Sequence, residues 1–318
     1  MKIKKNISLH DKNWFKTGGP ATWYAAPTSE IEFAKAIQHS QKYNLDIFIL
    51  GQGANILISD SGFNGLVIRP NITTISHKTI DANYAQVDAG TGLSIDTVIE
   101  YCLENNLVGL EEFSGIPGTV GGSVYINIHY FKHFLSNFLI EATIIDRHTA
   151  EIKTVDKNWF DFGYDKSKLM LKKHFLIDAS FLLKKTNSNQ TAYAKGRRAE
   201  IIRHRNARYP TSNTCGSFFR NFFDNEVNLQ IGGTNKKMIY VGYYLDKLGV
   251  KGNLKVGGAI VSHKHANMIV SNHETTSQDI IDLARSMQEM VQNKFRIIPQ
   301  PECQLVGFKE YPLLGKNE

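Results

Sequence analysis

Apolar and polar residues alternate along the chain with two periodicities, one typical of strands and one typical of helices. Short apolar runs bounded by turn residues predict strands at 23–26, 47–50, 66–68, 84–87 and 174–183. A hairpin is expected where the runs 141–146 and 151–155 flank the polar stretch 147–150. Strands and helical segments are thus interspersed along the chain.

Helical periodicity is clearest in three segments. Ser29, followed three residues later by Glu32, has the pattern of a capping box and predicts a helix that begins there. The segment 94–105 places apolar residues at i, i+3, i+4 and i+7, and 277–294 carries a broad apolar face. Both faces are expected to pack in a core. A polar loop is expected from Tyr209 to Asn221.

Two glycine-rich turns interrupt these patterns, and each follows an apolar run. The first spans Gly51–Asn55, and the second spans Ser114–Gly122. Because glycine accepts positive φ and lets another molecule approach the main chain, the amides of Gly118 to Gly122 are expected to converge on an anion such as a cofactor diphosphate. A Rossmann site is excluded because the G-x-G-x-x-G pattern is absent. Taken alone, either turn could also be purely structural.

Composition narrows the functions to consider. With 318 residues, 42% of them hydrophobic, the chain can fill several domain cores. No run approaches the ~18 apolar residues of a membrane span, and the N-terminus lacks the apolar core of a secretory signal. We therefore expect a cytoplasmic protein with no membrane partner. Cys102, Cys215 and Cys303 stand at no metal-ligand spacing, so free thiols and no metal site are expected.

The net charge of +7 does not by itself indicate nucleic acid, because the 37 basic and 30 acidic side chains are spread along the chain. No nucleic-acid partner is expected. The exception is the basic, helix-like segment 197–208. It is either a solvated helix face or a source of positive field for anionic ligands.

Several motifs, taken in order, resemble one enzyme family. They are L-G-Q-G-A-N at 50–55, S-G-I-P-G-T-V-G-G at 114–122, Y-P-T-S-N-T-C-G-S-F-F-R-N at 209–221, L-D-K-L-G-V-K-G at 245–252, S-H-K-H-A-N at 262–267 and P-E-C-Q-L-V-G at 301–307. From about Lys16 to Gly307 the chain resembles the UDP-N-acetylenolpyruvoylglucosamine reductases. The resemblance implies FAD and NADPH as cofactors and a UDP-sugar substrate. It also implies a role in peptidoglycan precursor synthesis, namely reduction of UDP-N-acetyl-3-O-(1-carboxyvinyl)glucosamine to UDP-N-acetylmuramate.

The family fold implied is α+β, with an FAD-binding PCMH-type domain of the vanillyl-alcohol-oxidase kind followed by a C-terminal α+β substrate domain. Two FAD-binding subdomains are expected at 1–70 and 71–190, with the PCMH-type domain at about 16–185 and the substrate domain at 195–310. A monomer is expected. The cofactor-binding residues implied are Gly51, Gln52, Gly53, Ala54, Asn55, Ser114, Gly115, Ile116, Pro117, Gly118, Thr119, Gly121 and Gly122.

Two residues of the matching motifs carry catalytic roles in the family. Ser217 stands at the position of the proton donor, and Glu302 at the position of a carboxylic group that shares a proton with the enolate formed on the substrate. The substrate-binding residues implied by the resemblance are Tyr164, Asn221, Lys251 and Asn267.

Two stretches depart from the family pattern. The family's N-A-G-A-x-G loop is replaced by Asn127–His133, so backbone there must turn without glycine. The family's Y-R-x-S, whose arginine steadies the enolate, is replaced by Tyr164-Asp165-Lys166-Ser167. A carboxylate cannot stabilise an enolate, so Asp165 must point away and another cation must act, with Lys166 as first candidate and Lys168 as second.

Two rival functions are compatible with the same residues. One is an FAD oxidoreductase of the same fold that acts on another alcohol or hydroxy acid. The other is a flavin- or nucleotide-binding protein without catalysis, suggested by the missing arginine.

Overall fold

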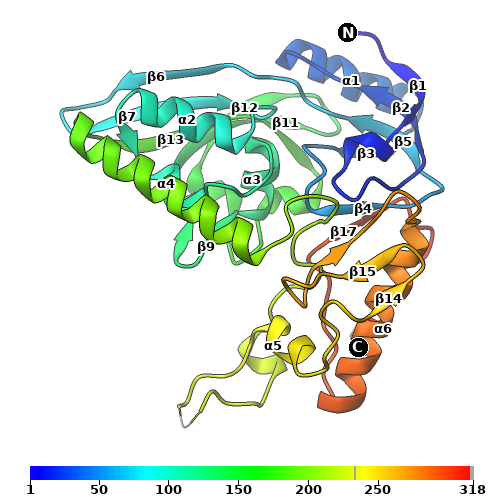
Figure 1. Ribbon diagram of the computed structural model, residues 1–318. Helices are drawn as coiled ribbons and strands as arrows, with labels where there is room; N and C mark the ends of the chain where they lie inside the picture. Colours follow the sequence, from blue (N-terminus) through cyan, green and yellow to red (C-terminus); the bar gives the residue numbers. More distant parts are fainter. Residues whose placement is uncertain (233, 316–318) are drawn as a thin grey trace. The chain divides into compact units, whose positions relative to one another are not determined.

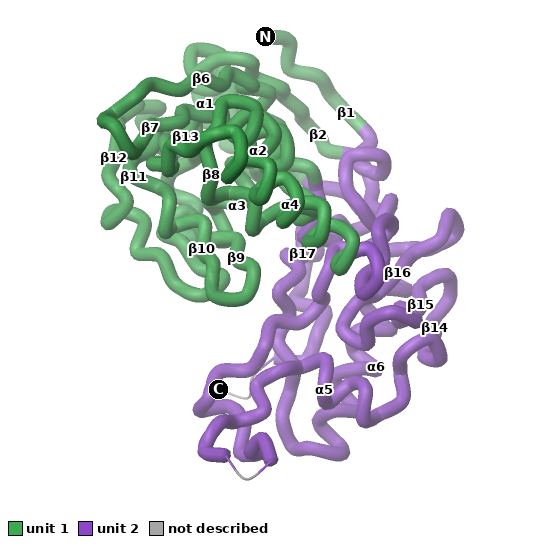
Figure 2. The backbone as a smooth tube through the Cα atoms, turned by 60° about the vertical axis from the view of Figure 1, so that its left-hand side comes forward, with its two compact units in different colours: residues 1–7, 21–52, 64–205 green, residues 8–20, 53–63, 206–318 purple. Residues whose placement is uncertain are grey.

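The chain folds into two compact units, each assembled from segments that are distant in the sequence (Figure 2). The computed structural model describes residues 1–232 and 234–315. Unit 1 comprises residues 1–7, 21–52 and 64–205. Unit 2 comprises residues 8–20, 53–63 and the described chain from 206 onward. The three domains expected from the sequence stay a prediction.

Unit 1 contains two large sheets and a two-stranded hairpin. A four-stranded sheet has the order β1 (Lys4–Ser8), β2 (Pro20–Ala25), β5 (Phe63–Ile68), β3 (Ile47–Ile49). A six-stranded sheet has the order β12 (Ile152–Asp156), β11 (Leu139–Asp146), β13 (His174–Lys185), β7 (Tyr84–Gly90), β6 (Ile75–Thr79), with β8 (Leu107–Val108) also paired to β13. The predicted hairpin is confirmed, because β11 and β12 pair antiparallel.

Four helices complete unit 1, and three of them accompany the six-stranded sheet (Figure 1). They are α1 (Glu30–Lys42), α2 (Ile95–Glu104), α3 (Val120–Ile126) and α4 (Ser188–Arg208). The predicted helix at 94–105 is confirmed, and its apolar stripe joins a core cluster with residues of β7, β11, β13 and α3. Ser29 caps α1 by accepting from the amide of Glu32 at 3.3 Å.

Short elements connect these strands and helices. The hairpin β9 (His129–Tyr130) and β10 (His133–Phe134) follows α3. Single 3₁₀ turns in the described chain include η1 (His10–Lys12), η2 (Leu110–Phe113), η3 (Leu135–Asn137), η4 (Lys157–Phe160), η5 (Lys168–Leu171) and η6 (Asp224–Glu226). Among these, η2 leads directly into the second glycine turn.

Unit 2 is built around the long helix α6. Its elements are β4 (Ile56–Ile58), α5 (Val241–Asp246), β14 (Lys255–Val256), β15 (Ala259–Val261), β16 (Ile269–Val270), α6 (Ser277–Phe295) and β17 (Gln304–Val306). Strands β14, β15 and β16 form one sheet, and β17 pairs parallel with β4. The predicted face of α6 is buried, with Ile280, Ala284, Met287 and Val291 in the core of the unit.

The expected loop after Tyr209 is confirmed as a segment without a helix or named strand, but the expectation that it is polar throughout is wrong. Its second half is core, because Phe218 and Phe219 are fully buried and the neighbouring Phe222 packs in the same cluster. Three aromatic side chains close together cannot stay in water when a helix face such as that of α6 is available.

The three cysteines are free thiols and buried, as predicted. Burial raises the pKa of Cys102 to about 12, so its thiol stays protonated at neutral pH. Among the described residues, no helix is both long and apolar enough to span a membrane.

Gln288 on α6 generates a prediction about stability. Its fully buried amide donates to the carbonyls of Pro299 and Leu314 at 2.7 and 3.0 Å and accepts from the Leu314 amide at 2.9 Å. Gln288→Met keeps the volume but leaves these buried backbone groups without partners, which should lower the free energy of unfolding by about 2–3 kcal/mol. Gln278→Met, on the exposed start of the same helix, should change it by less than about 0.5 kcal/mol in urea denaturation.

Candidate cofactor and substrate site

The second glycine turn, in unit 1, is held by its own neighbours more tightly than the sequence indicates. The amides of Val120 and Gly121 donate to the carbonyls of Leu93 and Thr91 at 2.8 and 3.0 Å. The amide of Gly122 donates to the Thr119 hydroxyl at 3.2 Å. The amides of Gly118 and Thr119 have no acceptor within the described residues. An anion at this turn would therefore be met by these two amides and not by the whole run 118–122.

The two glycine turns come close together at Gly51. A Cβ atom built on Gly51 would lie 2.7 Å from the Thr119 hydroxyl oxygen, nearer than real side chains approach. A Cβ atom built on Gly121 would likewise lie too close to the Thr91 hydroxyl oxygen. Glycine at both positions is thus required by close backbone approach, and it brings Gly51 and Gln52 beside the Ser114–Gly122 turn.

The rest of the first turn, Gly53–Asn55, lies in unit 2. It packs against the N-terminal segment of that unit. Gly53 has φ of 70°, and its carbonyl accepts from the Trp14 amide at 3.0 Å. Three buried side-chain oxygens nearby in the chain have no hydrogen-bond partner among the described residues: Asn13 Oδ1, Thr17 Oγ1 and Asn55 Oδ1. Buried acceptors without donors are costly, so this cluster fits a polar ligand that supplies donors, as the sugar and ring groups of FAD do.

The basic helix α4 is bound to the second glycine turn and does not present a simple solvated face. Arg197 makes a two-pronged pair with Glu112, at 3.0 and 2.9 Å, just before the turn. Arg205 donates through Nε to the Gly115 carbonyl at 3.0 Å. Arg205 was missed by sequence reasoning, because charge alone does not tell which arginine of a basic helix reaches a backbone carbonyl.

In unit 2, Ser217 belongs to an extended segment that is paired on both sides. Ser217 bridges to Met268, and the Phe218 amide donates to the Asn267 carbonyl at 2.8 Å. On the other side the Phe218 carbonyl accepts from the amide of Glu302 at 2.9 Å. The structure thus brings Ser217 and Glu302, which are far apart in the sequence, onto neighbouring segments. Both side chains are half-buried.

Glu302 is also linked to the first glycine turn. The Gln304 amide donates to the Asn55 carbonyl at 3.1 Å, and β17 then runs alongside β4. The last residue of the turn and the predicted acid therefore lie on neighbouring segments of one unit.

The predicted substrate-binding residues of unit 2 differ in how firmly they are held. Both polar atoms of the buried Asn267 side chain bind Phe219, with Oδ1 accepting from its amide at 3.1 Å and Nδ2 donating to its carbonyl at 2.7 Å. Asn221 Oδ1 accepts from the Val241 amide at 3.4 Å, at the start of α5. Lys251 is exposed, with its ammonium 3.3 Å from Asp246. Of the three, Lys251 has the most freedom to meet a ligand.

Tyr164 and Lys166 lie in a turn of unit 1. The Gly163 amide donates to the Lys166 carbonyl at 3.0 Å, which closes the turn. The Lys166 ammonium is 2.9 Å from the Asp161 carboxylate, and these side chains are 59% and 74% exposed. The nearby Lys168 ammonium lies over the Trp159 ring at 4.8 Å.

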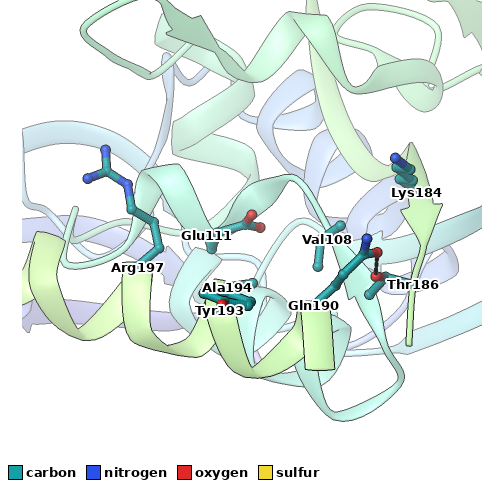
Figure 3. A pocket seen from close by; sticks show the side chains of 8 residues that line it. All are labelled: Val108, Glu111, Lys184, Thr186, Gln190, Tyr193, Ala194 and Arg197. Carbon is teal, nitrogen blue, oxygen red and sulfur yellow. Dashed lines mark hydrogen bonds between the residues drawn. The ribbon is translucent and has the colours of Figure 1, made fainter. Parts of the chain in front are cut away.

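A surface pocket of about 350 Å³ in unit 1 does not coincide with these residues (Figure 3). It lies between the first half of α4 and the β8–η2 segment, and its lining includes Val108, Gln190, Tyr193 and Arg197. It contains none of the predicted cofactor or catalytic residues. No cluster of three or more His, Cys, Asp or Glu side chains suited to a metal ion occurs in the described chain.

Comparison with known proteins agrees with this arrangement. A family model described as an FAD binding domain matches residues 21–156, and one described as UDP-N-acetylenolpyruvoylglucosamine reductase, C-terminal domain, matches residues 208–306. Together with the two glycine turns, these matches define an FAD-binding oxidoreductase with a C-terminal α+β domain.

The particular family follows from similarity along the whole chain. The chain is 30% identical over 306 residues to UDP-N-acetylenolpyruvoylglucosamine reductase 2 of Bacillus cereus, covering 96% of this chain and 93% of that protein. It is 29% identical, with the same coverage, to the UDP-N-acetylenolpyruvoylglucosamine reductase of Clostridium perfringens. The chain belongs to the UDP-N-acetylenolpyruvoylglucosamine reductase family.

The fold agrees with this membership. The crystal structure of UDP-N-acetylenolpyruvylglucosamine reductase from Thermus caldophilus superposes with a TM-score of 0.75, covering 96% of this chain and 99% of that one at 23% identity. The predicted fold class, an FAD-binding PCMH-type domain with a C-terminal α+β domain, is confirmed. FAD as cofactor is likewise confirmed by the domain match.

The contact between Arg205 and the glycine turn predicts an effect on FAD affinity. Arg205→Met removes a charged donor from the Gly115 carbonyl, so the turn loosens and the dissociation constant of FAD should rise about tenfold. Arg203→Met is the matched control, because Arg203 is exposed and pairs only within α4 to Glu200 in the contacts that the structure gives it. Quenching of flavin fluorescence on titration of apoprotein measures the FAD dissociation constant of each variant. Equal dissociation constants for the two variants would contradict a role of Arg205 in holding the turn.

Proposed function

We propose that the protein reduces UDP-N-acetyl-3-O-(1-carboxyvinyl)glucosamine to UDP-N-acetylmuramate with NADPH, in the synthesis of peptidoglycan precursors in the cytoplasm. The single observation that carries the proposal is the pairing of the Ser217 and Glu302 segments through the Phe218 carbonyl. This pairing supports a site in which a weak acid, Ser217, and a carboxylic group, Glu302, face one reacting centre. A UDP-sugar and NADPH are the proposed partners, and the proposed state is a monomer.

The chemistry divides between cofactor and side chains. When bound, FAD would take a hydride from NADPH and supply it to the enolpyruvyl double bond. Hydride addition leaves negative charge on the carbon that bears the substrate carboxylate, and the Ser217 hydroxyl donates the proton to this carbon. Glu302 shares a proton with the carboxylate oxygens while that charge develops, which lowers the barrier. The serine oxygen then regains its proton from solvent.

Substrate anchoring is proposed for three polar side chains of unit 2 and for Tyr164 of unit 1. Asn267, bound at both ends to Phe219, would act by fixing the segment that follows Ser217. Lys251 would meet the diphosphate of the UDP-sugar as a point charge, while Asn221 and Tyr164 would contact the sugar or its linkage.

A change at Ser217 should separate the two half-reactions. Ser217→Ala removes only the proton donor, so bleaching of FAD by anaerobic NADPH should keep its rate, while reoxidation by the enolpyruvyl substrate should slow at least about 100-fold. Stopped-flow absorbance of the flavin resolves both steps. Glu302→Gln should show the same selectivity.

Ser212→Ala is the control for this experiment, because Ser212 is exposed on the same segment and makes none of the contacts described for Ser217. It should leave both rates unchanged. Equal slowing of both half-reactions in Ser217→Ala would make the residue structural. A wild-type protein whose FAD is never bleached by NADPH would contradict the proposed reductase itself.

Lys166 is the cation that we propose to steady the enolate in place of an arginine. Its ion pair with Asp161 is exposed, and such pairs contribute little, so the ammonium can turn to a substrate. Lys166→Ala should slow flavin reoxidation by about 10-fold to 100-fold, and Lys166→Arg should restore most of the rate. If Lys168→Ala has the effect instead, the cation is Lys168; if neither variant slows an active enzyme, no lysine of this turn takes part.

A further inference from the structure

His129 and Asp165 belong to the two stretches that depart from the family motifs, and the structure places them side by side in unit 1. His129 Nδ1 lies 3.4 Å from Asp165 Oδ1, and the two side chains are 22% and 15% exposed. The segments that carry them are otherwise unrelated in sequence: one follows α3 and the other follows η4. Two departures that meet in space suggest one shared role.

The backbone holds this meeting point firmly. Asn127, the residue after α3, donates from Nδ2 to the Gly163 carbonyl at 3.0 Å. Ser167 donates from Oγ to the Tyr125 carbonyl at 2.6 Å. Each end of the Gly163–Ser167 segment is therefore tied to the C-terminal end of α3, the helix that begins in the second glycine turn.

Within this frame the imidazole of His129 lies among aromatic rings. Its centroid is 4.5 Å from that of Tyr164 and 5.3 Å from that of Phe134. Burial lowers the pKa of His129, so the ring is mainly neutral at neutral pH. The Asp165 carboxylate lies 3.4 Å from Nδ1, although this buried nitrogen makes no hydrogen bond to a described residue. A neutral imidazole carries one N–H, and a carboxylate this close favours Nδ1 as its site.

We propose that His129 is a positioning residue of the reductase: Asp165 orients its ring, and the ring sets the direction of the Tyr164 side chain toward the UDP-sugar substrate. The inference rests on the proposed function and adds to it a determinant of substrate affinity. It also gives Asp165 a role, because its carboxylate lies beside the imidazole of His129. The neighbouring Lys166 ammonium pairs with a different carboxylate, that of Asp161.

Unit 1 offers a matched control in a second pair of the same kind. His174 Nε2 lies 3.4 Å from Asp146 Oδ2, the side chains are 17% and 26% exposed, and the ring packs edge-on against Trp159. Burial lowers the pKa of His174 as well. This pair joins β11 to β13, and the contacts described for it include none with His129, Tyr164 or Asp165. The Trp159 ring links it to Lys168, the second candidate cation. Its disruption therefore reports what a merely structural His–Asp pair contributes.

The test compares His129→Phe with His174→Phe in the FAD-loaded enzyme. Phenylalanine keeps a ring but loses the N–H, so His129→Phe should raise KM for the UDP-sugar about fivefold to tenfold, while the rate of FAD bleaching by NADPH and the FAD content stay at wild-type values. His129→Asn, which retains an N–H close to the Nδ1 position, should recover part of the affinity. His174→Phe should leave KM within about twofold of wild type.

A double-mutant cycle links the effect to Asp165. If the carboxylate orients the ring, His129→Phe should raise KM less in the Asp165→Asn background than in the wild-type background. Additive effects, or an unchanged KM in His129→Phe of an active enzyme, would overturn this inference alone. A wild-type enzyme that reduces its FAD with NADPH but does not pass the hydride to the UDP-sugar would overturn the proposed function instead.

Discussion

The segment of unit 2 that carries Ser217 depends on the burial of Phe218 and Phe219. Two adjacent residues of an extended chain point to opposite sides, so both can be buried only if the segment has protein on each side. Unit 2 provides it without a regular sheet: Asn267–Met268 pairs along one edge, and Pro301–Glu302 pairs along the other. The buried residues Phe218 and Phe219, which follow Ser217, therefore fix its position. The same apolar burial that stabilises unit 2 thus sets the distance between the proposed donor and the proposed acid.

In unit 1 the equivalent constraint is steric and falls on glycine. The approach of Gly51 to the Thr119 side chain leaves no room for a Cβ where the two turns meet, and the approach of Gly121 to Thr91 leaves none where the second turn meets the end of β7. Once they meet, most amides of the second turn are used by the protein itself. What remains for an anion is a small, fixed set of donors. A rigid site of this kind binds with little loss of conformational entropy, which suits a cofactor that stays bound through turnover.

The sequence was sufficient where the signal is local and insufficient where contacts are long-range. The helix at 94–105, the hairpin of β11 and β12 and both glycine turns follow from periodicity and turn residues, and the structure has them. Arg205 on Gly115 and His129 beside Asp165 join segments whose separation leaves no periodic trace. The loop after Tyr209 was predicted correctly, but its burial was not. The small polar residues ahead of Phe218 suggested that the loop is polar throughout, although the aromatic residues behind them already indicated burial.

The loop after α3 turns without glycine at its first residue, an asparagine that the family motif also has. Asn127 takes φ of 51°, a left-handed conformation that asparagine tolerates better than most residues. Its side chain then repays the strain, because Oδ1 accepts from the Ser136 amide at 3.0 Å while Nδ2 reaches the Gly163 carbonyl. These two bonds couple the end of α3 to the turn of Tyr164 and Asp165. The coupling places His129, which stands at a glycine position of the family motif, beside Asp165.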